Sequence, residues 1–121
     1  MLTSSVLCLA LTIYHEARGE PTIGQQAVVE VVLNRSNKRD KSICEVVYEP
    51  KQFSWSSTKG VPKPNRDWDF SVDLARSYLA GEKKTSITNG AQYFHTNSIP
   101  LNCKAKNVKR IGNHVFYNIG K

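Results

Sequence analysis

The chain has 121 residues, a length that indicates one domain (residues 1–121) able to bury a core without disulfide or metal support. Hydrophobic residues make up 40% and charged residues 22% of it, a balance that excludes a disordered chain. Its 17 basic and 10 acidic residues leave a net charge of +7, which favours a polyanionic partner such as nucleic acid, an anionic envelope polymer or a lipid surface.

An apolar segment at the N-terminus predicts a helix that runs to about Ala17. Hydroxyl residues at positions 3–5 can cap its start, and Gly19 and Pro21 stop it. Residues 1–13 are as apolar as a signal peptide, but they lack a positively charged start and a cleavage site and are too short to cross a membrane. We therefore expect a buried helix of the mature domain, in a protein that has no signal peptide and does not span a membrane.

Two more helices are expected in the first half of the chain. Residues 24–37 place alanine and valine at helical spacing, and the length of the stretch favours a helix over a strand. The run Ser42-Ile-Cys-Glu45 is a capping-box pattern, which predicts a short helix ending near Tyr48.

The segment 51–66 is rich in serine, lysine, glycine and proline, which predicts a long surface loop. A further helix should begin at Asp67 and bury one face formed by Phe70, Leu74 and Tyr78. Trp68 is expected to be a packing residue at the start of that helix.

Two short aromatic segments, 91–95 and 114–117, are bounded by turn residues. They predict a small β ribbon that pairs across the basic loop 96–113. The expected fold class is therefore α+β, mainly helical, with a small β element near the C-terminus.

The three cysteines, Cys8, Cys44 and Cys103, fit neither a disulfide framework nor a CxxC zinc site. An odd number leaves at least one thiol unpaired in a monomer. We expect reduced, partly buried cysteines of a chain made in a reducing cytosol.

Glu16 is the first candidate for chemistry, because it ends an apolar helix. A carboxylic acid that protonates a glycosidic oxygen must stay protonated near neutral pH, and desolvation at the end of a buried helix beside a cleft would achieve this. The alternative is an ordinary solvated glutamate at a helix terminus.

Four blocks in register resemble the SleB-like cell-wall hydrolase family, which includes spore-cortex-lytic enzymes and many phage endolysins. The blocks are Glu16-Ala-Arg-Gly-Glu-Pro-x-x-Gly-Gln25 with Val32-Leu-Asn-Arg35, Val46-Val-Tyr-Glu-Pro-Lys-Gln-Phe-Ser54, Gly90-Ala-Gln-Tyr-Phe-His95 and Ile111-Gly-Asn-His-Val-Phe-Tyr117. The resemblance spans nearly the whole chain. It implies a lysozyme-like, lytic-transglycosylase-like single catalytic domain, activity on peptidoglycan, and Glu16 as the catalytic residue.

The spacing of Glu16 from Gly24-Gln25, together with a later Ala91-Gln-Tyr93, is also similar to a compressed lytic transglycosylase pattern. Glycosidases normally need two acids, whereas a lytic transglycosylase can use one. Glu20 is the nearby candidate for a second acid, but Gly19 and Pro21 break the helix between them. We therefore favour cleavage between MurNAc and GlcNAc by one acid, and expect Glu20 to pair with Arg18 or to cap the next helix.

Six residues are candidates for substrate binding. Gln25 and Gln52 could bind the N-acetyl groups or be ordinary polar residues, while Phe53 and Trp55 offer faces for sugar stacking. Tyr93 could hydrogen-bond near the reacting sugar or be a core tyrosine. His95 is expected to be a structural or a substrate-contacting histidine.

A zinc amidase that attacks the same wall is the alternative enzyme, with His15, His95 and His114 as possible ligands. No HExxH or other short zinc pattern is present in the sequence, so we expect neither a metal nor another cofactor.

The basic run of Lys104, Lys106, Lys109 and Arg110, with Lys38, Arg39 and Lys41, predicts attraction to anionic cell-envelope polymers and lacks the signature of a nucleic-acid module. A basic, non-enzymatic wall-binding module is the third hypothesis. The first is a monomeric phage endolysin, synthesised in the host cytoplasm and acting on peptidoglycan in the cell wall or periplasm.

Overall fold

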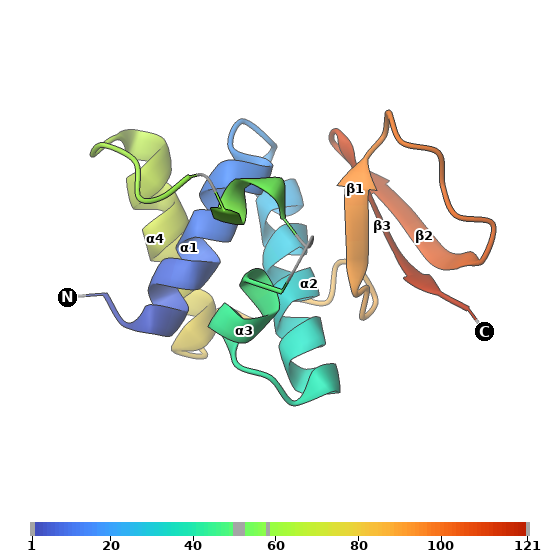
Figure 1. Cartoon of the computed structure of the whole chain (residues 1–121), viewed down its shortest axis with the longest axis horizontal. Helices are drawn as coiled ribbons and strands as arrows, with labels where there is room; N and C mark the ends of the chain where they lie inside the picture. The colour runs from blue at the N-terminus through green and yellow to red at the C-terminus, as the bar shows by residue number, and fades with distance from the viewer. Residues whose placement is uncertain (1, 50–52, 58, 121) are drawn as a thin grey trace.

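The computed structural model describes residues 2–49, 53–57 and 59–120. Helices gather at one end of the molecule and a three-stranded sheet lies at the other (Figure 1). In chain order the elements are α1 (Ser4–Ala17), α2 (Thr22–Arg39), α3 (Ile43–Val47), the 3-10 turn η1 (Ser54–Ser57), α4 (Arg66–Leu79), β1 (Tyr93–Thr96), β2 (Ala105–Ile111) and β3 (His114–Ile119).

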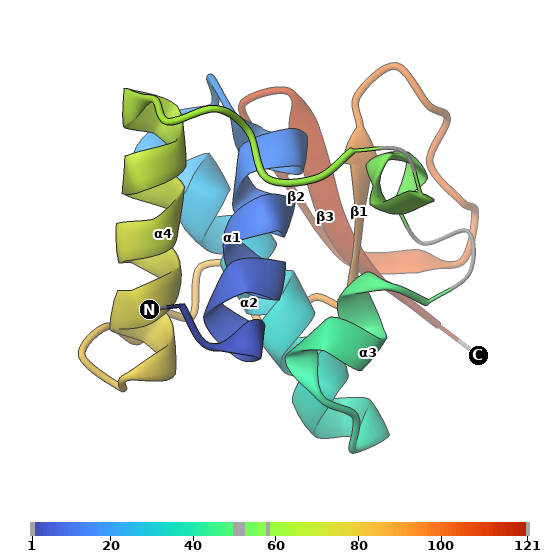
Figure 2. The same ribbon diagram turned by 60° about the vertical axis from the view of Figure 1, so that its left-hand side comes forward.

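Helix α1 is the central element, in contact with α2, α3 and α4 (Figure 2). Thr3 caps it by accepting a hydrogen bond from the Val6 amide, which confirms a hydroxyl cap in the range 3–5. Because neighbours cover several of its faces, most of its residues from Val6 to Ala17 are buried. No helix in the described part of the chain is both long and apolar enough to cross a bilayer.

Helix α2 confirms the helical reading of 24–37 and extends it at both ends. Its four valines at positions 28, 29, 31 and 32 are fully buried, which explains why strand-favouring residues occur in a helix: packing outweighs their intrinsic preference. Asp40 closes the helix in a left-handed conformation.

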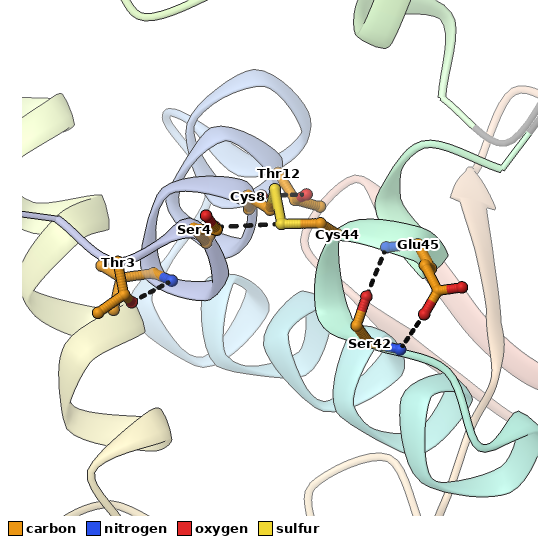
Figure 3. The surroundings of a disulfide bond; sticks show 8 residues. Thr3, Ser4, Cys8, Thr12, Ser42, Cys44 and Glu45 are labelled. Carbon is orange, nitrogen blue, oxygen red and sulfur yellow. Dashed lines mark hydrogen bonds between the residues drawn. A yellow bond between two sulfur atoms is a disulfide. The ribbon is translucent and has the colours of Figure 1, made fainter.

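Helix α3 has the predicted capping box, in which Ser42 and Glu45 exchange side-chain and backbone hydrogen bonds. The expectation of reduced cysteines was wrong for two of the three: Cys44 of α3 forms a disulfide with Cys8 of α1 (Figure 3). The exposed Cys103 is free. Cys44 Sγ also lies 3.1 Å from the Ser4 carbonyl oxygen, a contact rather than a hydrogen bond because a disulfide sulfur carries no proton. Sequence spacing does not disclose this pair, because its two members come from separate helices that the fold brings together.

The segment between α3 and α4 is less open than predicted. Its described part contains η1, and the side chains of Phe53 and Trp55 are buried there. Helix α4 begins one residue before Asp67, capped by Asn65, and buries Trp68, Leu74 and Tyr78. Phe70, expected on the buried face, is exposed instead.

The predicted ribbon is confirmed: β1 pairs with β3 antiparallel, with Tyr93 opposite Tyr117 and Thr96 opposite His114. Strand β2, which lies inside the segment 96–113 predicted as a loop, was missed and completes the order β1-β3-β2. Its exposed side chains are largely basic, a composition that suits an edge strand and conceals it in a hydropathy pattern.

Two buried clusters hold the fold together. One lies between the four helices, and the other joins α2 to the sheet through Ala17, Val28, Val31, Ile111 and Phe116. Phe94 of β1 packs against both clusters. The C-terminal end of α1 therefore lies where the helical part meets the sheet.

Candidate active site

Glu16 lies in the last turn of α1, between the buried Tyr14 and the fully buried Ala17, and its own side chain is half-buried. Gly19, at a positive φ of 86°, turns the chain away directly after the helix. This sequence of an apolar helix and a glycine turn holds a carboxyl group at the rim of the core.

Burial raises the pKa of Glu16 above its ordinary value of 4.5, and the Trp55 side chain, a hydrogen-bond donor, lowers it in part. Trp55 Nε1 has no hydrogen bond of regular geometry with a described residue, so its interaction with the carboxyl is weak. The negative end of the α1 dipole also disfavours a carboxylate at this position. Glu16 is thus biased toward the protonated form that a general acid needs.

An aromatic row connects the end of α1 to the sheet. The Trp55 ring lies 4.9 Å from the His15 ring and 5.8 Å from the Phe53 ring, centroid to centroid, and Phe53 packs at 6.1 Å against Phe94. His15 is held in place by a 3.0 Å hydrogen bond between Nε2 and the Gly60 carbonyl. Phe53 and Trp55 are only 6% and 4% exposed, so this conformation offers no open ring face for a sugar; the open stacking faces predicted for them are not present.

Gln25 is the polar residue that α2 brings to the end of α1. Its Nε2 donates to the Ala17 carbonyl at 3.2 Å, one residue beyond Glu16. Its Oε1 is buried and has no hydrogen-bond partner within the described residues. The acceptor is closed to solvent, so the N–H of an acetamido group can reach it only after the side chains over it move. Gln52, the other glutamine predicted to bind N-acetyl groups, lies outside the described residues.

Glu20 has a different role from the two expected of it. It neither pairs with Arg18 nor caps α2; its carboxylate accepts hydrogen bonds from the Asn113 backbone and side chain at 2.8 and 2.9 Å. His114 Nδ1 lies 3.7 Å away, and burial lowers the pKa of this histidine. Arg18 instead donates to Asp67 at 3.0 Å and to Tyr14. Glu20 therefore joins the α1–α2 turn to the β2–β3 turn.

Tyr93 and His95 lie on β1, against Tyr117 of β3, at ring-centroid distances of 5.8 and 5.2 Å. The Arg35 guanidinium lies 5.3 Å from the centre of the Tyr93 ring. Tyr93 is at the opposite end of β1 from Thr96, which pairs with the His114 that approaches Glu20. The structure thus places Gln25 and Trp55 at the end of α1 that carries Glu16, and Tyr93 at the end of β1 that lies away from His114.

The histidines are not arranged as a metal site. Within residues 2–49, 53–57 and 59–120, no group of three or more histidine, cysteine, aspartate or glutamate side chains could hold an ion. His15 and His95 instead lie 3.0 and 2.8 Å from backbone carbonyl oxygens.

Sequence reasoning missed the partners of Glu20 and Arg18. Asn113 belongs to a recognised motif block, but its contact with Glu20 joins residues 93 positions apart. The charge of Asp67 was visible in the sequence, yet nothing in its neighbourhood indicated Arg18, which is 49 positions away.

Comparison with known proteins gives the same family as the motifs. A family model described as Cell Wall Hydrolase matches residues 19–117, a span that begins three residues after Glu16. The spore cortex-lytic enzyme of Bacillus subtilis (strain 168) is 30% identical over 93% of the chain, and that of Oceanobacillus iheyensis is 40% identical, also over 93%. The chain spans only 37% and 41% of the length of these two relatives.

Solved structures agree with this result. The catalytic domain of the Bacillus cereus SleB protein superposes with a TM-score of 0.72 at 27% identity, covering 94% of this chain and 89% of that one. The catalytic domain of the germination-specific lytic transglycosylase SleB from Bacillus anthracis gives a TM-score of 0.71 at 25% identity, covering 98% and 97%. These matches confirm the expected lysozyme-like, mainly helical fold with its small C-terminal sheet. With the family model matched over most of its length, the chain belongs to the cell wall hydrolase family.

Proposed function

We propose that this protein is a peptidoglycan-degrading enzyme that cleaves the glycan strand between MurNAc and GlcNAc as a lytic transglycosylase, with Glu16 as its acid and base. The observation that carries the proposal is the half-buried Glu16 with its raised pKa at the end of an apolar helix. The family, and relatives described as spore cortex-lytic enzymes and as a lytic transglycosylase, support the choice of substrate.

The second carboxylate supports a single-acid route. Glu20 is held by two hydrogen bonds from Asn113, and its side chain is only 9% exposed, so it is not placed to activate a water molecule. In the proposed reaction Glu16 donates its proton to the glycosidic oxygen, and the bond to the leaving sugar breaks. The carboxylate then takes the proton of the muramic C6 hydroxyl, whose oxygen attacks C1 and leaves a 1,6-anhydro end.

Around this acid we propose that Gln25 accepts a hydrogen bond from an N-acetyl group. Gln25 Oε1 has no hydrogen-bond partner among the described residues, and Trp55 Nε1 has none of regular geometry. Because both atoms are closed to solvent, the role requires the side chains over them to move when a glycan binds. We also propose that the substrate contacts four other residues, Gln52, Phe53, Tyr93 and His95. The contacts described above give no additional support for their role.

We also propose that residues 1–121 act as one catalytic domain and a monomer, and that the protein serves as a phage endolysin, synthesised in the host cytoplasm and acting in the wall or periplasm. The Cys8–Cys44 disulfide supports a place of action outside the reducing cytosol, because disulfides persist in oxidising compartments. The net charge of +7 supports attraction to anionic envelope polymers.

Mass spectrometry of peptidoglycan digested by the purified protein tests this function. A lytic transglycosylase releases fragments with anhydromuramic ends, which are one water lighter than the products of hydrolysis. Products with reducing muramic ends would show that the enzyme is a hydrolase and not a lytic transglycosylase. Intact glycan strands together with newly formed amines, in a reaction that EDTA stops, would show that the enzyme is a zinc amidase.

A further inference from the structure

A row of hollows follows the C-terminal half of α2. Three neighbouring pockets of about 340, 430 and 680 Å³ share residues: the first two have Asn34 and Asn37 in common, and the last two have Lys38, Gln92 and Asn118 in common. We call this continuous depression the α2 trough. It runs from the end of α4 to the sheet, where Lys106 is one of its lining residues.

The trough is separate from the residues around Glu16, although Tyr93, a proposed substrate contact, lines its last hollow. Glu16, Gln25 and Trp55 do not line any of its three hollows. Gln25 and Asn34 are nine positions apart on one helix, which corresponds to about 13 Å along its axis.

The lining of the trough is cationic. Lys83 and Lys84 lie at its first end and Lys38 and Lys106 at its last, and none of these four pairs with a carboxylate among the described residues. The acidic lining residue, Glu30, is buried and accepts hydrogen bonds from Thr85 and from the Ile87 and Thr88 amides. Its oxygens are therefore already hydrogen-bonded within the fold.

Four other basic residues named from the sequence have partners outside the trough. Arg39 and Lys41 pair with Glu49, while Lys109 and Arg110 donate to the Ile87 carbonyl and to Asn97. Lys38 and Lys106, by contrast, come from different elements and line one hollow. Charge from α2 and β2 thus converges on the last hollow of the trough, while other basic side chains, Lys104 among them, also lack a carboxylate partner in the described part of the chain.

Between the lysines the lining is made largely of amides. The side chains of Asn37 and Gln92 make no hydrogen bond to another described residue, and Asn118 lies beside them. Amides that can donate and accept suit the hydroxyl and acetamido groups of a sugar chain, and lysines at intervals suit negative charges spaced along it. The Tyr93 ring at the end of the row packs between Tyr117 and Arg35, so the trough lacks the free stacking platforms of a single-strand nucleic-acid site.

We propose that the α2 trough is a second binding site, for an acidic glycopolymer of the cell wall, which holds the enzyme on its insoluble substrate while Glu16 acts elsewhere. The negative groups could be the stem-peptide carboxylates of peptidoglycan or the phosphates of a polymer attached to it. The proposal rests on the proposed function for the choice of polymer, but binding can be measured without catalysis.

The test is sedimentation with purified insoluble wall, performed in an E16Q background so that the ligand is not consumed. Lys38→Glu with Lys106→Glu should weaken binding roughly tenfold at low salt. The matched control is Arg66→Glu with Arg76→Glu on α4, which changes the net charge equally at residues that line none of the three hollows and should weaken binding less than about twofold. An equal loss in both pairs, or no loss in either, would overturn the proposal. If a thermal melt shows that the charge-reversed variant does not fold, Lys38→Gln with Lys106→Gln is used instead. Its control is Arg66→Gln with Arg76→Gln, and the trough pair should again lose more binding than the control pair.

The source of the negative charge is separated by treating the wall. Loss of trough-dependent binding after hydrofluoric acid removes attached phosphopolymers would assign the phosphates, and loss after amidation of the carboxyl groups would assign the stem peptides. Binding that survives both treatments, or that duplex DNA competes away as well as wall fragments do, would contradict an acidic glycopolymer site. Failure of the proposed function would appear separately, as a protein with Glu16 intact that binds wall but releases no fragments.

Discussion

Glu16 and Glu20 are four positions apart in the chain and have opposite surroundings. Glu16 has burial and a helix C-terminus against its charge. Glu20 accepts two hydrogen bonds from Asn113. This difference is the basis for proposing a chemical role for Glu16 and a structural one for Glu20.

The raised pKa of Glu16 gives the reaction a predictable pH dependence. A general acid must be protonated, so fragment release from purified peptidoglycan should be fastest at and below the raised pKa and should fall as the pH rises through it. Initial rates between pH 4 and pH 9 would measure this limb. Rates that increase steadily over the same range would indicate an ionised catalyst and contradict the assignment.

The same shift predicts a stability effect of Glu16→Gln. Because the folded-state pKa lies above the unfolded value near 4.5, the folded chain loses stability as the pH rises through this window and Glu16 ionises. Glutamine remains neutral, so the variant should unfold at a higher temperature than the parent at pH 7, and the difference should vanish below pH 4. Equal melting temperatures at pH 7 would show that the carboxyl is fully solvated.

The sequence predicted the position of Glu16 but not the partners of the residues around it. A helix that is apolar up to its last turn is visible in the sequence, and so is the glycine that ends it. The contact of Glu20 with Asn113 depends on how the sheet lies against α2, which no local pattern contains. For the same reason the pairing of Cys8 with Cys44 could not be deduced.

At the scale of elements, the β2–β3 turn is tied to the helices through Gly112. This glycine has a φ of +57°, and a Cβ at its position would lie less than 3.0 Å from the Glu20 carboxylate. The turn is therefore held both by backbone conformation and by close approach.

Gly112→Ala should consequently destabilise the fold more than an alanine at a comparable glycine. Gly81 has a φ of +76° with open space around it, so Gly81→Ala should cost only the left-handed conformation, about 1–2 kcal/mol. Urea unfolding of both variants measures the difference. A Gly112→Ala variant no less stable than Gly81→Ala would show that Glu20 is not fixed against the turn.

Elements whose hydropathy pattern matches their burial were predictable from the sequence. Elements whose composition suggests a different degree of burial from the one observed were not. Helices α1, α2 and α3 and the pairing of β1 with β3 were expected from spacing and caps. Strand β2 was concealed by its basic residues, and the polar composition around η1 concealed the burial of Phe53 and Trp55. In both cases composition indicated exposure, whereas tertiary packing determined the structure.

At the scale of the whole molecule, the disulfide fixes α3 to α1, the helix that carries Glu16. The bridge joins residues 36 positions apart, and closing a loop of that size in the unfolded chain corresponds to about 3–4 kcal/mol of stability. The protein should therefore be more stable in an oxidising compartment than in the cytosol.

Cys8→Ala with Cys44→Ala should lower the free energy of unfolding by about that amount, 3–4 kcal/mol, and reduction of the parent should have a similar effect. Cys103→Ala serves as the control, because Cys103 is exposed and free. Denaturant unfolding with and without dithiothreitol provides the measurement. A parent protein whose unfolding midpoint is insensitive to reduction would mean that the bridge does not form.

The clearance of purified peptidoglycan by the Glu16→Gln variant tests the central claim most directly, measured beside the parent at the pH of maximal activity. Glutamine keeps the shape of the side chain but cannot give up a proton, so the rate should fall by about 100-fold or more while thermal unfolding shows an intact fold. A folded variant that clears the suspension at close to the parental rate would contradict the assignment of Glu16 as the acid.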